Sequence, residues 1–224
     1  MSHTGDVIRG LYQAFGQTLG PSRWWPGDTP FEVAVGAILT QNTNWKNVEQ
    51  AIANLKRADA MTEKGLRALP PAVLEDMIRP AGSFRIKTVR LTNFLDFLEQ
   101  ESGLDIEALG QHNLYDLRPK LLSVRGIGPE TADSILCYAL GKPTFVVDAY
   151  TFRMFARHGL VYEGMDYHEL QETIMDALPQ DVADYNEFHA LVVRASKEWC
   201  SKSRPKCAAC PARELLPDPE RLPQ

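Results

Sequence analysis

Asp148 is the side chain in this 224-residue sequence that is best placed for acid–base chemistry. It follows the apolar run Phe145-Val146-Val147, so we expect its carboxylate to emerge from buried chain at the start of a helix. Burial raises the pKa of such a group, and the dipole of a helix N-terminus lowers it. A carboxylate held in this way can stabilise a positive charge or accept a proton from water. An aspartate before a helix is also a common N-cap, and the two roles are compatible.

Three of the four cysteines form a second group of side chains that could do chemistry. Cys200, Cys207 and Cys210 crowd together near the end of the sequence, whereas Cys137 stands alone in an apolar run and is expected to be a small core residue. In a reducing compartment, clustered thiols favour metal ligation over disulfide formation. The sequence therefore predicts a metal site in its last two dozen residues.

A glycine-rich turn provides the third feature. The string Val124-Arg125-Gly126-Ile127-Gly128-Pro129 lies between an amphipathic segment at 114–122 and a helix-like run at 130–140. Two glycines allow a sharp turn, and Pro129 suits the first turn of a helix because its missing N–H would be unpaired there. Backbone N–H groups at such a turn can bind a phosphate without a net positive charge. A simple tight turn between helices is the alternative interpretation.

The elements that position these residues are predicted to be helices. Apolar residues recur at helical spacing almost throughout, as in Phe31, Val35, Ile38 and Leu39, and no alternating strand pattern competes with them. Proline and glycine interrupt the apolar runs at short intervals, which indicates roughly ten short helices joined by short loops. The predicted class is all-α.

Composition limits the kind of partner. The chain has 24 Lys and Arg against 29 Asp and Glu, a formal net charge of −5, which argues against a generic polyanion binder and requires any contact with DNA to be local. No apolar stretch is long enough to span a membrane, and the N-terminus lacks the order of a secretory signal. We expect a soluble, cytoplasmic protein without a membrane partner.

The turn and the aspartate occur together in a recognisable order. The string from Val124 to Asp133, followed by Lys142-Pro143-Thr144-Phe145-Val146-Val147-Asp148, resembles the helix-hairpin-helix, Gly/Pro-rich loop and aspartate of the endonuclease III-like DNA glycosylase superfamily. The resemblance covers about residues 20 to 215. It implies two all-α domains with a DNA cleft between them: a six-helix barrel with the helix-hairpin-helix at 23–142, and an iron–sulfur cluster domain at 1–22 and 143–224.

The resemblance implies roles for two residues in catalysis. Asp148 matches the aspartate that stabilises the sugar cation and positions or deprotonates water. Bifunctional relatives carry a lysine, which forms a Schiff base with the sugar, at the position of Glu130. A carboxylate cannot form an imine, so we expect a monofunctional DNA N-glycosylase that lacks the lyase step. The alternatives are a noncatalytic lesion-recognition protein and a nonspecific DNA-binding module.

The resemblance also implies how the DNA is held. Arg125, Gly126, Ile127 and Gly128 are expected to bind a phosphate, and Gln41, in a segment similar to the family's Leu-Ser-x-Gln, to fill the gap left by an extruded base. Relatives often insert a second, apolar residue into the DNA stack as a wedge, and this sequence has Ser83 at that position. Phe84 could take its place. Aromatic residues that could either stack on the extruded base or serve only in packing are Trp24, Trp25, Trp45 and Phe84.

The cysteines match the first three ligands of the family's four-iron four-sulfur (4Fe-4S) motif, and the position of the fourth cysteine is Leu216. Asp218 is the preferred replacement ligand and Glu214 the second candidate, while a zinc ion and an empty site are the alternatives to the cluster.

The six-residue loop between Cys200 and Cys207 is locally basic. It contains Lys202, Arg204 and Lys206, which are expected to contact phosphates, although they could be only solvated surface charges. The expected partner of the whole protein is double-stranded DNA with a damaged base, bound by a monomer. The sequence does not identify the lesion.

Overall fold

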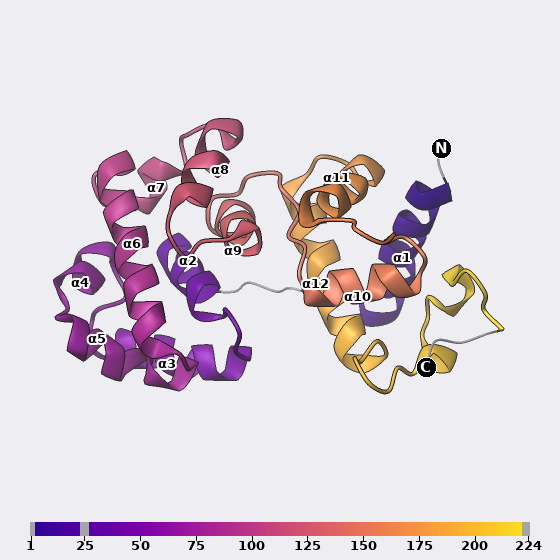
Figure 1. Ribbon diagram of the computed structural model, residues 1–224, viewed down its shortest axis with the longest axis horizontal. Helices are drawn as coiled ribbons and strands as arrows, with labels where there is room; N and C mark the ends of the chain where they lie inside the picture. Colours follow the sequence, from indigo (N-terminus) through magenta and orange to yellow (C-terminus); the bar gives the residue numbers. More distant parts are fainter. Residues whose placement is uncertain (1–2, 23–26, 221–224) are drawn as a thin grey trace. The chain divides into compact units, whose positions relative to one another are not determined.

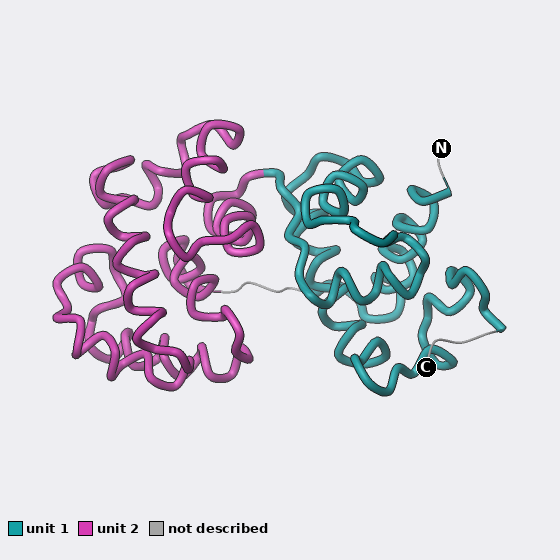
Figure 2. The backbone as a smooth tube through the Cα atoms, viewed as in Figure 1, with its two compact units in different colours: residues 1–24, 143–224 teal, residues 25–142 magenta. Residues whose placement is uncertain are grey.

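The computed structural model describes residues 3–22 and 27–220, and all regular secondary structure in these ranges is helical (Figure 1). The predicted all-α class is confirmed. Trp24 and Trp25 lie outside the described residues. The chain divides into two compact units, unit 1 with residues 1–24 and 143–224 and unit 2 with residues 25–142 (Figure 2). The boundaries that the sequence resemblance implies are residues 23 and 142.

Unit 2 is built around helix α2, which is buried on nearly all sides. Residues from Phe31 to Leu39 supply its apolar surface, and helices from both ends of the unit pack against it. A helix that is hydrophobic all round must be covered in this way. The helices of the unit are α2 (Pro30–Leu39), α3 (Trp45–Arg57), α4 (Glu63–Ala68), α5 (Pro71–Ile78), α6 (Phe84–Ser102), α7 (Ile106–Leu109), α8 (Leu114–Ser123) and α9 (Pro129–Ser134), with the short 3₁₀ helix η1 (Arg79–Ala81) and the π-helical segment η2 (Ile135–Ala139).

Unit 1 joins the first helix to the last third of the chain. Helix α1 (His3–Leu19) packs against α11 (Tyr167–Ala177) and α12 (Val182–Glu198), and α12 also packs against α10 (Ala149–Arg157). Arg194 fixes the end of α1, since its guanidinium donates to the carbonyls of Leu19 and Gly20. Two short turns, η3 (Cys207–Ala209) and η4 (Arg213–Leu215), follow α12.

Side-chain caps define where many of these helices begin. Thr29, Asn44, Asn113, Asp148 and Asp181 each accept a hydrogen bond from a backbone N–H in the first turn that follows. Such caps satisfy donors that have no partner within the helix. Among the described residues, no helix combines the length and the apolar character that crossing a membrane requires.

Candidate functional site

The glycine-rich turn connects α8 to α9 within unit 2. Gly126 has a φ of 98°, Ile127 is buried, and Gly128 precedes α9 with Pro129 in its first position. The Ile127 N–H donates to the carbonyl of Val124 at 3.0 Å, which closes the turn. The predicted turn geometry is therefore confirmed, with the apolar side chain inside and the glycine backbone outside.

Two charged residues near the glycines are exposed: Arg125, directly before Gly126, and Glu130, two residues after Gly128. The carbonyl of Arg125 accepts a hydrogen bond from the side-chain amide of Asn93 at 2.8 Å, and the residue is exposed. Glu130 is the second residue of α9, and its carbonyl accepts a hydrogen bond from the Ser134 hydroxyl. Glu130 therefore lies at the surface beside the turn.

Gln41 is bound to the turn rather than extended into solvent. Its Nε2 donates to the carbonyl of Gly126 at 3.0 Å and to the hydroxyl of Thr131 at 2.9 Å, and its Oε1 accepts a hydrogen bond from Arg90. These contacts join the loop after α2 to both sides of the turn. Gap filling in DNA would require Gln41 to exchange them, so that role stays a prediction. Arg90 was not identified from the sequence, because its partners are distant along the chain.

The two glycines of the turn differ in what a side chain would meet. At Gly126, a Cβ would lie 2.5 Å from Cγ of Arg90, on a backbone whose φ disfavours side chains. We expect Gly126→Ala to destabilise the fold by about 1–3 kcal/mol, measured as a shift in thermal or urea unfolding.

Gly128→Ala is the matched control, because a Cβ there meets nothing within 4 Å and φ is −92°. We expect this variant to unfold like the parent and to bind duplex DNA more weakly, since the new methyl group would stand between the backbone and a phosphate. Unchanged DNA affinity of Gly128→Ala would contradict a phosphate site at this backbone.

Lys87 holds two loops of unit 2 in place from inside the core. Its side chain is 1% exposed, and its Nζ donates to the carbonyls of Leu39 at 2.9 Å and Ala81 at 2.7 Å. Burial lowers the pKa of Lys87, and the charge of Arg90 lowers it further. The ammonium thus fixes the ends of α2 and η1, from which the Gln41 loop and the Gly82-Ser83 loop begin.

The described aromatic candidates for base stacking are packing residues in this structure. Trp45 and Phe84 are partly buried against the core of unit 2. The guanidinium carbon of Arg79 lies 4.6 Å from the centre of the Phe84 ring, within the range of a cation–π contact. These contacts support the alternative in which both rings serve the fold.

Asp148 is the N-cap of α10, as the sequence predicts. Its Oδ1 accepts hydrogen bonds from the backbone N–H of Thr151 at 2.7 Å and the Thr151 hydroxyl at 2.9 Å, and its Oδ2 lies 3.6 Å from Nε2 of His189. Burial alone would raise the pKa of Asp148, but His189 and the bonds from Thr151 together bring it below its usual value. The result is a largely buried carboxylate that stays ionised at neutral pH.

His189 is a functional candidate that the sequence did not reveal. It lies on α12, is 5% exposed and packs edge-on against Phe145. A lone histidine within a helix gives no signal of its partner, because Asp148 is on another element. Its contact with the carboxylate becomes visible only in the folded chain.

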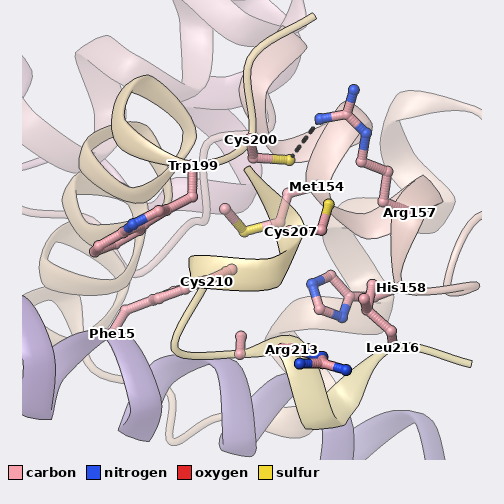
Figure 3. Close-up of a pocket in the computed structure, with 11 residues that line it drawn as sticks. Phe15, Met154, Arg157, His158, Trp199, Cys200, Cys207, Cys210, Arg213 and Leu216 are labelled. Atoms are coloured by element: carbon pink, nitrogen blue, oxygen red, sulfur yellow. Dashed lines mark hydrogen bonds between the residues drawn. The ribbon is translucent and has the colours of Figure 1, made fainter. Parts of the chain in front are cut away.

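The three clustered cysteines line one pocket of unit 1, together with His158 and Leu216 (Figure 3). Cys200 and Cys207 are buried, and the Cys200 sulfur accepts a hydrogen bond from the Arg157 guanidinium at 3.0 Å. Burial raises the pKa of the Cys207 thiol. Within residues 3–22 and 27–220, no three His, Cys, Asp or Glu side chains lie close enough to hold a single ion.

Cys137 and Asp218 lie apart from this pocket. Cys137 is in the core of unit 2, where burial raises its pKa to about 12, and this agrees with the predicted packing role. Asp218 is exposed, its Oδ1 accepts a hydrogen bond from the Glu220 N–H at 3.1 Å, and its side chain is not part of the pocket lining.

The basic loop is exposed in unit 1. Lys202, Arg204 and Lys206 all have solvent-accessible side chains, and the ammonium of Lys206 lies 3.5 Å from a carboxylate oxygen of Glu198. The carbonyls of Lys202 and Arg204 accept hydrogen bonds from Arg157 and Ser201, so the loop backbone is fixed while its charged groups face water.

Known proteins resemble this chain along nearly its whole length. A protein of Methanocaldococcus jannaschii, MJ1434, which is named as a candidate DNA repair glycosylase, is 44% identical over 94% of this chain and 96% of its own. Endonuclease III of Thermotoga maritima is 26% identical over 81% of this chain and 79% of its own.

Solved structures agree with this relationship. The H. pylori 3-methyladenine DNA glycosylase MagIII, bound to 1,N6-ethenoadenine, is 29% identical and superposes with a TM-score of 0.73, over 87% of this chain and 97% of its own. A covalent endonuclease III–DNA intermediate superposes with a TM-score of 0.83 at 20% identity, over 98% of both chains. Residues 35–180 match the model of the HhH-GPD superfamily base excision DNA repair proteins. The chain therefore belongs to the HhH-GPD superfamily of base excision DNA repair proteins.

Proposed function

We propose that this protein is a monofunctional glycosylase that removes a damaged base from duplex DNA by hydrolysis. The observation that carries the proposal is Asp148, a largely buried carboxylate kept ionised by His189 and Thr151. An alkylated purine is the first substrate to test, because the 29% identical MagIII is a 3-methyladenine glycosylase solved with a modified adenine.

The reaction follows from the charge of this carboxylate. As the bond between C1′ and the base nitrogen breaks, the base leaves with the electron pair and C1′ gains positive charge. Ionised Asp148 stabilises that charge and accepts a proton from the attacking water, whose oxygen forms the new bond to C1′. The products are the free base and an abasic site in an intact strand.

Glu130 supports the absence of a lyase step. It occupies the position of the family's Schiff-base lysine, and a carboxylate has no amine to attack the sugar. We therefore expect no β-elimination that depends on this position.

DNA binding is proposed for two surfaces, one in each unit. The backbone N–H groups of Gly126 and Gly128, with Arg125 beside them, are suited to one phosphate. The N–H of Ile127, which the sequence also suggested as a phosphate donor, is instead used within the turn, where it donates to the carbonyl of Val124. The exposed side chains of the Cys200–Cys207 loop add cations in a chain whose net charge is −5. These local N–H donors and cations allow contact with DNA although the net charge of the chain is negative. We propose that a monomer provides both surfaces.

We also propose that Cys200, Cys207 and Cys210 hold a 4Fe-4S cluster in unit 1, with unit 2 as the six-helix barrel. The donor set fits such a group, since the three thiols line one pocket and the Cys200 sulfur accepts a hydrogen bond from Arg157. A bound cluster would stiffen the chain that carries the basic loop. Asp218 is the sequence-based candidate for the fourth ligand, and a bound zinc ion is the competing outcome of metal analysis.

The function is tested with duplexes that contain 3-methyladenine, thymine glycol or uracil opposite guanine, incubated with purified protein and analysed with and without alkali. We expect strand breaks only after alkali, because hydrolysis leaves an alkali-labile abasic site. Breaks without alkali would contradict the role given to Glu130. Lesion-selective binding without base release would instead support the alternative of a noncatalytic lesion-recognition protein.

A further inference from the structure

The proposed cluster lacks a fourth ligand at the position where the motif places one. Leu216 stands there, and its aliphatic side chain lines the same pocket as Cys200, Cys207 and Cys210. An aliphatic group cannot coordinate iron. A donor from elsewhere in unit 1 must complete the set if four protein ligands are present.

His158 is a nitrogen donor in the lining of this pocket. It ends α10 as the C-cap residue and is 7% exposed, and the labelled side chains of Figure 3 include its imidazole with Leu216 and the three cysteines. No pattern in the sequence indicates this histidine as a ligand, since two helices, α11 and α12, separate it from Cys200.

The orientation of the imidazole is fixed by the segment that carries Leu216. Nδ1 of His158 lies 3.2 Å from the carbonyl oxygen of Leu215. A carbonyl oxygen can only accept, so this hydrogen bond requires the proton to be on Nδ1 and leaves the lone pair on Nε2. Among the described residues, Nε2 has no hydrogen-bond partner. Histidines that bind metals usually donate their other ring N–H to a carbonyl or a carboxylate in this manner.

A second contact keeps these two segments together. Gly159 follows His158 with a φ of 70°, and a Cβ at this position would lie 2.8 Å from Cγ of Pro217. The end of α10 and the residues around Leu216 are therefore in direct contact. This packing brings the imidazole to the part of the pocket where the family's fourth cysteine would stand.

The two carboxylates near the cysteine motif, Asp218 and Glu214, are less suited to be the fourth ligand. Asp218 is exposed and binds the N–H of Glu220, and Glu214 is also exposed, 4.0 Å from Nε of Arg213. Neither side chain is part of the pocket lining. The imidazole of His158, by contrast, is buried and lines the same pocket as the thiols.

We propose that Nε2 of His158 is the fourth protein ligand of the iron–sulfur cluster, which makes the site three thiolates and one imidazole. This inference rests on the cluster proposed above. The hydrogen bond from Nδ1 to Leu215 orients the ring, and the three cysteines supply the other protein bonds to iron. Leu216 then contributes only an apolar wall to the same pocket.

The direct test is spectroscopic and uses the unaltered protein, purified without oxygen. The protein is prepared with ordinary histidine and with ¹⁵N-histidine, its cluster is reduced to a paramagnetic state, and electron spin-echo modulation is recorded. We expect a strong nitrogen coupling that changes its isotope pattern with the ¹⁵N label. No histidine coupling in the cluster signal would overturn the proposal, as would a protein that contains zinc or no metal.

Variants provide a second readout that a merely structural role would not produce. We expect the iron content to fall from about four atoms per chain in the parent to about three or fewer in His158→Ala. The double variant His158→Ala/Leu216→Cys should again bind about four iron atoms but show no nitrogen coupling. Asp218→Ala is the control and should keep both iron and coupling. Loss of iron in Asp218→Ala, or failure of the added cysteine to restore iron, would contradict ligation by His158.

These measurements are independent of base release. If histidine coupling is observed while no lesion duplex loses its base, the proposed glycosylase mechanism is wrong and the ligand assignment stands. If base release occurs without histidine coupling, only the ligand assignment fails.

Discussion

Replacement of Asp148 by asparagine is expected to lower the rate of base release by about 100- to 10,000-fold, the range associated with the loss of a positioned acid–base group. Asparagine has nearly the same shape and can still accept the hydrogen bonds from Thr151, so α10 should keep its cap. What the variant loses is the negative charge and the ability to accept a proton. The measurement is single-turnover release of the damaged base, with unfolding followed in parallel.

Asp166→Asn is the matched control for this experiment. Asp166 caps α11 in the same unit and also accepts two backbone hydrogen bonds, but its carboxylate is exposed. The same chemical change there should leave base release within about twofold of the parent, because surface substitutions away from special features are usually mild. Equal rates for Asp148→Asn and the parent would exclude Asp148 as the reacting carboxylate.

The sequence was sufficient for features that depend on neighbouring residues. Helical spacing of apolar residues predicted the all-α class, and the apolar run before Asp148 predicted its place at a helix start, because both depend on local periodicity and capping. The turn at Gly126 and Gly128 could also be predicted, since a positive φ favours glycine and proline is common in the first turn of a helix.

The partners of these residues could not be predicted, because folding brings them from distant parts of the chain. Gln41 meets Gly126 and Arg90, and Asp148 meets His189, across separations that no spacing rule describes. The same limit applies to the pocket of the cysteines. Sequence proximity favoured Asp218 as a ligand, whereas the fold presents His158 to the pocket from the end of another helix.

The hairpin depends on a buried ion pair that the sequence did not reveal. Arg118 on α8 donates from Nε and Nη2 to the two carboxylate oxygens of Asp133 on α9, at 2.8 and 2.9 Å. The Asp133 side chain is fully buried, and that of Arg118 is 22% exposed. A bidentate pair of this kind fixes the two helices on either side of the glycine turn in both distance and orientation.

Arg118→Met is therefore expected to lower the free energy of unfolding by about 3–5 kcal/mol, because it leaves a buried carboxylate without its guanidinium. Affinity for duplex DNA should also fall, since the helices that hold the turn proposed to bind a phosphate lose their fixed spacing. Urea unfolding and a DNA titration measure the two effects. Arg67→Met is the control, as Arg67 pairs with Asp96 and Glu99 at the surface of the same unit and should cost at most about 1 kcal/mol.

The double variant Arg118→Met/Asp133→Leu separates two contributions to the free energy of unfolding: the cost of leaving the buried Asp133 without the Arg118 guanidinium, and the stabilisation by the ion pair itself. Apolar residues that replace both members of a buried ion pair are often neutral for stability, so the double variant should regain most of the stability that Arg118→Met loses. If its DNA affinity stays low while its stability returns, the pair serves mainly to orient the hairpin. If the double variant is as unstable as Arg118→Met, the loss comes from packing around Arg118 rather than from the loss of the guanidinium beside Asp133, and the electrostatic explanation is wrong.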